Sequence, residues 1–366
     1  MKNSIDSVLR NLRSMAGLGL VLTGSLLATP LGAQGYRQTF LVSDLANVAA
    51  HTDTNLVNAW GLAIGAEGTL VVCATESSLA GFYRPDGRHV GDYIEVDEDP
   101  TGVAINPWGG AFRLTGGLAA RPSRLLFVTE EGKIMGWNPH VDAEAAVVAV
   151  DNSTSKAVYK GLALAHSRKG PRLYATNFRG AKVEMYDGGW HLLGTFTDAT
   201  VDAGFAPFNI ANIGGLLFVT FAKQEAPDLE DDEPGAGNGF VDVFDLDGHM
   251  VRRFASHGPL NSPWGIAWAP KHFGPLGNAL LIGNFGDGRI NAFDPRTGAF
   301  LGALSDAQGN AIVTDGLWSL QFSHNFNDRD DRHQTDEEDA ALYFTAGPAD
   351  ESHGVVGKIV AERRHH

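Results

Sequence analysis

Residues 261–304 hold the stretch that decides the fold, with four apolar runs in close succession: SPWGIAWAP (262–270), ALLIGNFGDG (279–288), RINAFDPRTG (289–298) and AFLGAL (299–304). Gly, Asn, Asp and Pro separate these runs, and such residues supply positive φ angles and local side-chain caps at tight turns. Strand-like runs divided by turn signals at this density predict a four-stranded antiparallel sheet. One such sheet cannot bury both of its faces alone, so we expect further copies elsewhere in the chain.

The copies are found through a short motif, Gly-apolar-Ala or a close variant, that opens each predicted sheet. The residues directly before this motif are Trp60, Thr101, Lys160, Phe208, Trp264 and Trp318. The steps between them are 41, 59, 48, 56 and 54 residues. Units of about 40–50 residues are typical of propeller blades. Insertions at 107–121 and 223–239 lie within the two longest steps, and a third insertion, 325–339, follows the last motif. The sequence therefore predicts an all-β fold, a six-bladed β-propeller.

The two ends of the repeat predict how the ring closes. An isolated strand, Tyr36–Asp44, precedes the first blade, whereas the last blade lacks a fourth strand after 355–360. Pairing these two segments would remove an exposed sheet edge. We therefore expect residues 34–366 to form a single propeller domain, closed by the N-terminal strand in the last blade.

The first 33 residues have the pattern of a signal peptide. Lys2, Arg10 and Arg13 precede an apolar run at 16–28 that is too short to span a membrane, and small residues follow at 31–33. Export to the periplasm or the exterior is expected.

Charge and cysteine content narrow the partners further. The 366 residues carry a formal net charge of −15, which disfavours nucleic acid and anionic membrane surfaces. The single cysteine, Cys73, excludes an internal disulfide framework and is expected to be a small buried apolar residue. We expect a monomer that does not span the membrane.

The residues before the repeated motif suggest a collar around one opening of the channel. Trp60, Phe208, Trp264 and Trp318 share one register, and Lys160 and Thr101 complete the ring. Tryptophan faces stack on sugars or aromatic groups and hold cations, while Lys160, the only charge, could meet an anionic ligand. The collar is therefore a predicted ligand site. The alternative is that each aromatic residue simply packs between neighbouring blades.

Loops on the same face add further candidates. Asn177 and Asn284 are predicted ligand-binding residues, and His51, Asp53 and His353 are the first metal ligands to consider. The alternative for the Asn and Asp residues is that they cap backbone N–H groups at turns. The acidic runs 228–233 and 328–339 lack the spacing of a calcium loop, so both are expected to be solvated.

Several segments also carry a family resemblance. They include HTDTNLVNAWGLA (51–63), NGFVDVFD (238–245), LIGNFGDGRINAFDPRTGAFLG (281–302) and LYFTAGPADESHG (342–354). Together they resemble a family of exported bacterial proteins related to the NHL-repeat propellers, and the resemblance covers nearly the whole mature chain. It implies the propeller fold and export, but no established reaction.

Enzymes with similar folds supply a second comparison. Metal-dependent lactonases on propellers place Asn or Asp directly before the inner-strand Gly, where this chain has none. Amidating lyases on six-bladed propellers use several His as zinc ligands, and the His residues here lack the short spacing of a zinc site. The predicted function is therefore the binding of a small molecule or a protein partner at one face of the channel. The alternative is a metal-dependent hydrolase or lyase, with calcium or zinc as the cofactor to expect.

Overall fold

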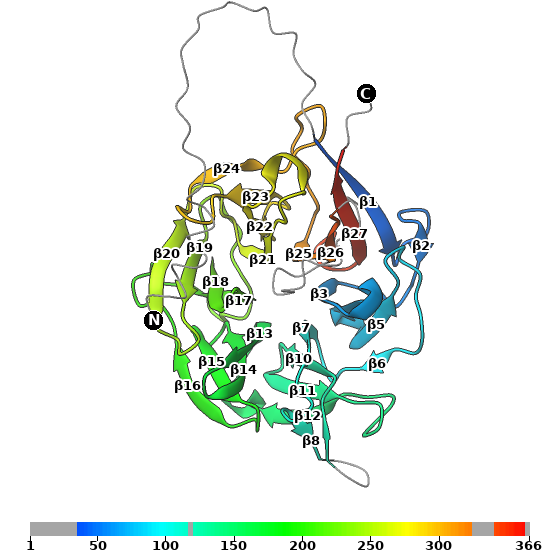
Figure 1. Cartoon of the computed structure of the whole chain (residues 1–366), viewed down its shortest axis with the longest axis vertical. Coiled ribbons are helices and arrows are strands. Elements are labelled where there is room, and N and C mark those ends of the chain that lie inside the picture. The colour runs from blue at the N-terminus through cyan, green and yellow to red at the C-terminus, as the bar shows by residue number, and fades with distance from the viewer. Residues whose placement is uncertain (1–34, 116–119, 324–339, 363–366) are drawn as a thin grey trace, which may run out of the picture. The chain divides into compact units, whose positions relative to one another are not determined.

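Six antiparallel sheets surround a central axis in the computed structural model, which describes residues 35–115, 120–323 and 340–362 (Figure 1). The first three sheets, each written from the axis outward, are β3 (Ala59–Ile64), β4 (Leu70–Ala74), β5 (Leu79–Tyr83) and β6 (Ile94–Glu95); β7 (Pro100–Ile105), β10 (Leu125–Thr129), β11 (Lys133–Trp137) and β12 (Val147–Asp151); and β13 (Tyr159–Ser167), β14 (Gly170–Asn177), β15 (Lys182–Asp187) and β16 (Leu192–Phe196). The next two are β17 (Phe205–Ile213), β18 (Leu216–Lys223), β19 (Phe240–Phe244) and β20 (Met250–Ser256); and β21 (Pro263–Trp268), β22 (Leu280–Asn284), β23 (Ile290–Phe293) and β24 (Phe300–Ala303). The predicted propeller is confirmed.

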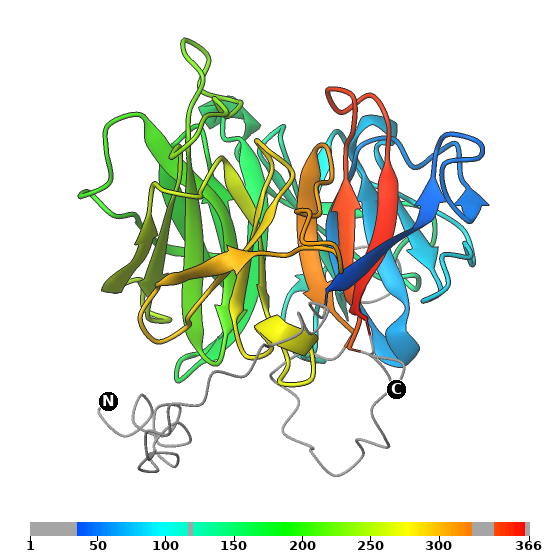
Figure 2. The ribbon, with the colours of Figure 1, turned by 90° about the horizontal axis from the view of Figure 1, so that it is seen from above.

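The sixth sheet closes the ring with both ends of the described chain. It contains β25 (Leu317–Phe322), β26 (Leu342–Ala346), β27 (Val355–Ala361), β1 (Tyr36–Ser43) and the two-residue β2 (His51–Thr52). Strand β1 runs antiparallel to β27, from the pair Tyr36 and Ala361 to the pair Ser43 and Val355. Figure 2 shows β1 in blue crossing beside β27 in red. The predicted closure is therefore confirmed, whereas the predicted signal peptide lies outside the described residues.

The connections between strands differ mainly in length. A small hairpin, β8 (Arg113–Leu114) with β9 (Arg121–Pro122), lies in the connection between β7 and β10. Within the described residues, short 3-10 turns occupy Ala66–Gly68, Thr75–Ser77, Ser153–Ser155 and Gly274–Leu276. The connection from β18 to β19 contains the first acidic run, whereas the second acidic run, 328–339, lies outside the described residues.

The apolar core is divided into layers between successive blades. Each layer takes buried side chains from two neighbouring sheets: Tyr174 of the third blade, for example, packs in one cluster with Ile210 and Phe221 of the fourth. Both faces of each blade are apolar because both are covered by a neighbour. Cys73 is fully buried in such a layer, as expected. Full burial of one large apolar side chain contributes about 1.5–3 kcal/mol, so these layers fix the inner strands that frame the channel.

Candidate functional site

The aromatic residues of the predicted collar meet one another inside the channel. Trp60 stacks on Trp318 with ring centroids 3.6 Å apart, and Trp264 meets both edge-on at 6.3 and 5.9 Å. Phe208 lies 6.0 Å from Trp318, and Phe285 stacks on its ring at 3.9 Å. The four collar rings are at most 5% exposed. We call this cluster the aromatic plug, since it fills the channel at the end where the inner strands begin.

Hydrogen bonds hold the plug in place. Trp318 Nε1 donates to Asn58 Oδ1 at 3.0 Å, and Trp264 Nε1 donates to the backbone carbonyl of Lys160 at 3.0 Å. The latter bond joins the fifth blade to the third. Thr101, also buried, donates to the Tyr159 carbonyl at 2.7 Å. Trp60 Nε1 is buried and has no partner within the described part of the chain.

Lys160 stands over the plug, already neutralised by carboxylates. Its side chain is 3% exposed, and its ammonium contacts Glu130 and lies 3.1 Å from Asp231 Oδ1. The same ammonium is 5.1 Å from the centre of the Trp60 ring. Burial lowers the pKa of Lys160, but these two carboxylates outweigh burial and raise it overall. Lys160 therefore stays protonated and offers no unpaired positive charge, contrary to the predicted selection of an anion.

Further carboxyl groups surround Lys160 and make this end of the channel, the mouth beside the aromatic plug, acidic. Burial raises the pKa of Glu351 to about 7 against the favourable charge of Lys160, and Asn58 Nδ2 donates to Glu351 Oε2 at 2.5 Å. Burial likewise raises the pKa of Asp232 to about 6. Loss of hydration on burial is the main cause of both raised pKa values, and repulsion from neighbouring carboxylates adds a smaller part.

The first acidic run lies beside Lys160. Most of it is exposed, as predicted for a solvated loop, and Asp232 is the exception. Asp232 is only 9% exposed. Asp231 pairs with Lys160, and Glu230 pairs with Arg179. The Gln224 side chain anchors the start of the loop by donating to the Phe178 carbonyl at 2.8 Å. Sequence reasoning missed the contact with Lys160, because that residue lies 71 positions before Asp231.

Asn177 caps its own turn, whereas Asn284 makes different contacts. Asn177 Oδ1 accepts from the backbone of Gly180 at 2.9 Å, and its Nδ2 donates to Glu184 at 2.9 Å. Asn284 Nδ2 donates to the Pro259 carbonyl at 2.8 Å and to Asp287 at 3.0 Å. Both side chains are buried. The contacts of Asn177 fit the alternative interpretation of turn capping, whereas Asn284 Oδ1 is buried and has no hydrogen-bond partner among the described residues.

The three predicted metal ligands have other partners. Asp53 accepts from the hydroxyls of Tyr83 and Tyr93, both at 2.7 Å. His353 Nδ1 lies 2.7 Å from Asp44 Oδ2, and His51 belongs to β2, where it pairs with Val42. Among residues 35–115, 120–323 and 340–362, no group of three or more His, Cys, Asp or Glu is arranged to hold a metal ion.

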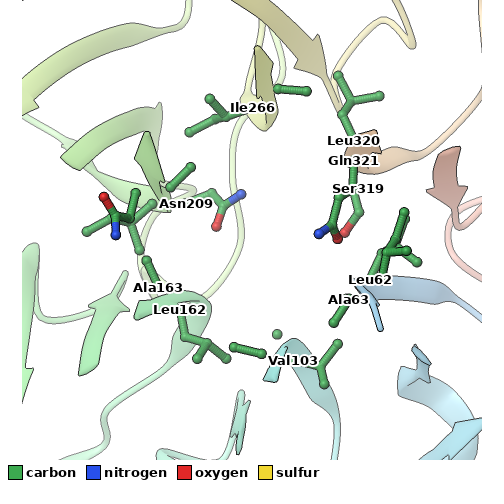
Figure 3. A pocket seen from close by; sticks show the side chains of 18 of the residues that line it. Leu62, Ala63, Val103, Leu162, Ala163, Asn209, Ile266, Ser319, Leu320 and Gln321 are labelled. Atoms are coloured by element: carbon green, nitrogen blue, oxygen red, sulfur yellow. The ribbon is translucent and has the colours of Figure 1, made fainter. Parts of the chain in front are cut away.

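Beyond the plug, the channel is hollow. A cavity of about 310 Å³ lies inside the ring of inner strands (Figure 3). Its wall comes from all six blades, chiefly from the residues one to four positions after the collar, and no charged residue lines it. The wall becomes more exposed away from the plug, where Ile105 is 37% exposed. The volume of the cavity is at the lower limit for small-molecule pockets.

Three departures from the repeat place polar groups in this wall. Five blades have Ala three positions after the collar, at 63, 104, 163, 211 and 267, whereas the sixth has Gln321. Four blades have Gly directly after the collar, and the other two have Asn209 and Ser319. Sequence reasoning missed these residues, although reading the repeat a few positions further would have found them.

Two of these polar groups form hydrogen bonds within the protein, and the third does not. Asn209 Nδ2 donates to the Trp264 carbonyl at 2.8 Å, and Ser319 Oγ donates to the Trp60 carbonyl at 2.7 Å. The half-buried side chain of Gln321 makes no hydrogen bond to any other described residue. In Figure 3 the amides of Asn209 and Gln321 point into the hollow from opposite sides. Gln321 therefore offers a free donor and a free acceptor inside a cavity that no charged residue lines.

Relatives by sequence come from a virus. The chain is 31% identical to uncharacterized protein R648 of Acanthamoeba polyphaga mimivirus over 90% of its own length and 81% of that protein. It is 32% identical to uncharacterized protein L690 of the same virus over 90% of this chain and 86% of that one. These relatives give no support to the bacterial origin implied by the resemblance. No protein-family model matches the chain.

Solved structures with under 25% identity support the fold alone. A streptogramin B lyase superposes with a TM-score of 0.52 at 8% identity, covering 89% of this chain and 98% of that one. A structural-genomics protein of unknown function from Bacteroides thetaiotaomicron reaches 0.56 at 10% identity, covering 90% and 77%. Within the described ranges, no helix is long and apolar enough to cross a membrane.

Proposed function

The chain belongs to the family that includes the mimivirus proteins R648 and L690, and we propose that it binds a small, uncharged molecule in the central channel. The ligand enters the cavity of about 310 Å³ and rests against the aromatic plug. It carries one polar group, an amide, carbonyl or hydroxyl, that pairs with Gln321. This is a binding function at one face of the channel, and no reaction is assigned to it.

The observation that carries the proposal is the free amide of Gln321 in a wall without charged side chains. The neighbouring Asn209 and Ser319 form hydrogen bonds within the protein, whereas the half-buried amide of Gln321 forms none with another described residue. An apolar pocket with a few convergent polar groups is the usual form of a small-molecule site.

The chemistry of the wall favours a neutral ligand. No lining residue is charged, so a charged molecule would lose its hydration without gaining a counter-charge. The inner strands supply Leu62, Val103, Leu162, Ile266 and Leu320, which match an apolar body. The collar residues then act as the rigid floor of the site rather than as its mouth.

A screen of neutral fragments tests this proposal. Each fragment has an apolar ring and a single amide, carbonyl or hydroxyl, and binding is followed by ligand-observed NMR. Ala104 is half-buried and lines the cavity, so Ala104→Phe fills part of it. We expect fragments that bind the parent to bind Ala104→Phe at least tenfold more weakly.

The matched control is Ala143→Phe, the same change at an exposed turn residue. It should bind the fragments as the parent does, and melting curves should show that both variants are folded. If no fragment binds the parent, or if fragments bind Ala104→Phe unchanged, the channel is not the ligand site.

The alternative, a metal-dependent hydrolase or lyase, has less support. It would need His51, Asp53 and His353 to converge, and the contacts of Asp53 and His353 lie elsewhere. Elemental analysis of the purified protein separates the two functions, since stoichiometric calcium or zinc would favour the enzyme.

The remaining features of the proposal come from the sequence. The leader at 1–33 supports export to the periplasm or the exterior. The net charge of −15 argues against nucleic acid as a partner. We propose a monomer, because the channel is complete within one chain.

A further inference from the structure

A second pocket lies away from the channel, beside the insertion of the second blade. Its volume is about 380 Å³, and its wall includes Trp108, Arg121, Arg124 and His140. The insertion runs from residue 106 to residue 124, between β7 and β10. The equivalent connections of the third and fourth blades are two residues long. A propeller blade therefore does not need this segment.

The insertion is anchored, so the pocket has a fixed shape. Phe112 is fully buried, and its backbone N–H donates to the Gly188 carbonyl of the third blade at 2.6 Å. Its ring meets Trp190 edge-on at 5.1 Å. The Ser123 hydroxyl donates to the Phe112 carbonyl at 2.5 Å.

Two asparagines shape the rim of the pocket. Asn106 Oδ1 accepts from the backbone N–H of Trp108 at 3.0 Å, and its Nδ2 donates to the Ser123 carbonyl at 2.9 Å. Asn138 repeats this pattern, accepting from the backbone of His140 at 2.9 Å and donating to the Pro122 carbonyl at 2.7 Å. Asn106 thus links the turn that carries Trp108 to residues 121–124, and Asn138 links the turn that carries His140 to the same residues. Pre-organised walls reduce the entropy cost of binding.

The charge of this pocket is opposite to that of the chain. Arg121, Arg124 and His140 line it, and no Asp or Glu does, although the net charge of the protein is −15. Both arginines are exposed, and neither side chain makes an ion pair or a hydrogen bond with another described residue. Arginine guanidinium groups bind carboxylate or phosphate through paired hydrogen bonds.

We propose that this pocket binds an anionic molecule with a flat ring, whose carboxylate or phosphate meets Arg121 and Arg124 and whose ring lies against Trp108. The half-buried indole lies 5.8 Å from His166 and 6.1 Å from Phe112, measured between ring centroids, and is thereby held in place. An indole face adds about 0.5–1.5 kcal/mol when it stacks on another ring. The site is independent of the channel, so it neither supports nor requires the function proposed above.

Two probes of the same shape and different charge test the inference. 2-Naphthoate is an anion, and 2-naphthamide is its neutral counterpart. Isothermal titration at low salt should show naphthoate binding at least tenfold more tightly than naphthamide. This preference should shrink in 0.5 M NaCl, since exposed charges are screened at that ionic strength.

Variants test whether naphthoate binds in this pocket. The double variant Arg121→Met/Arg124→Met keeps most of the apolar stems and should lose the preference for naphthoate. Arg168→Met, at another exposed arginine without an ion pair, should keep it. Trp108→Ala should weaken both probes by a similar factor, and the channel variant Ala104→Phe should leave naphthoate binding unchanged.

The inference is overturned if naphthoate does not bind, if it binds the double variant as tightly as the parent, or if Ala104→Phe abolishes its binding. The last result would place the probe in the channel. Loss of fragment binding in the channel alone would leave the inference standing and end only the function proposed above.

Discussion

The two ends of the channel are built from one repeat and are filled in opposite ways. Where the inner strands begin, the collar positions hold Trp60, Phe208, Trp264 and Trp318, all at most 5% exposed. Three positions further along, five of the six blades have alanine, and a cavity of about 310 Å³ remains. One end is therefore a close-packed core, and the other is a space that a ligand can fill.

This difference shows how a repeat can produce a site. Large residues at one register converge on the axis and close it, while small residues at the next inward register leave it open. Exceptions to the repeat then determine chemistry: Lys160 introduces charge at the closed end, and Gln321 introduces a free amide at the open end. Changes at the closed end should affect stability, whereas changes at the open end should affect binding.

The largest expected effect is at the plug. Trp318 packs between Trp60 and Phe285 and bonds to Asn58, so Trp318→Ala leaves a large cavity and removes the partner of Asn58 Oδ1. We expect a loss of about 3–5 kcal/mol in the free energy of unfolding, measured by urea denaturation.

The open end supplies the control for this prediction. Ile105→Ala removes an apolar side chain that is already 37% exposed and should cost less than about 1 kcal/mol. Equal losses for Ile105→Ala and Trp318→Ala would mean that the two ends do not differ as described.

The second effect concerns the charge above the plug. Lys160→Met keeps the apolar stem but leaves Glu130 and Asp231 without their cation. Removing one partner of a buried ion pair costs about 3–5 kcal/mol, and the exposure of Asp231 reduces this to about 2–4 kcal/mol. The exposed pair of Lys223 and Glu233 is the control, and Lys223→Met should cost less than about 1 kcal/mol.

A double variant then identifies the cause. Glu130→Gln in the Lys160→Met background should recover part of the loss, because it removes one uncompensated charge. If Lys160→Met lowers the free energy of unfolding no more than Lys223→Met does, the ion pairs of Lys160 do not stabilise this end of the channel.

The sequence predicted the fold more fully than it predicted the site. Turn residues and strand runs recur locally, so the six blades and the pairing of β1 with β27 followed from spacing alone. The contacts of Lys160 did not, because Glu130 and Asp231 come from loops of other blades. Gln321 was missed for another reason: a residue that departs from a repeat is visible only once the whole register is aligned.

The third effect is a pH dependence at the mouth. Burial raises the pKa of Glu351 from 4.5 to about 7, so the folded chain keeps a proton that the unfolded chain releases between these values. The parent should therefore lose stability as pH rises from about 4.5 to 7 and change little above that range. Glu351→Gln removes this loss, because its carbonyl can still accept from Asn58, and should be about 1–2 kcal/mol more stable than the parent at pH 8.

Denaturation of both proteins at pH 5 and pH 8 checks this sign. Glu76→Gln, at an exposed glutamate in the turn after β4, is the control for the loss of one negative charge. A Glu351→Gln variant whose advantage does not grow with pH would show that Glu351 ionises normally.

The smallest effect on stability is expected at Gln321, and it is the sharpest test of the open end. Gln321→Leu replaces a free amide by an apolar group of similar size, so no hydrogen bond within the protein is lost and the free energy of unfolding should change by less than about 0.5 kcal/mol. Binding should change more, because an amide fragment loses its partner in the wall while a purely apolar fragment does not. We therefore expect Gln321→Leu to weaken a bound amide or hydroxyl fragment about tenfold and to leave its apolar analogue unchanged or slightly tighter. Both fragments can be measured by ligand-observed NMR on the same samples used for the melting curves. If both weaken together, Gln321 only shapes the cavity; if the protein unfolds, the amide has a structural partner and the open end belongs to the core as the plug does.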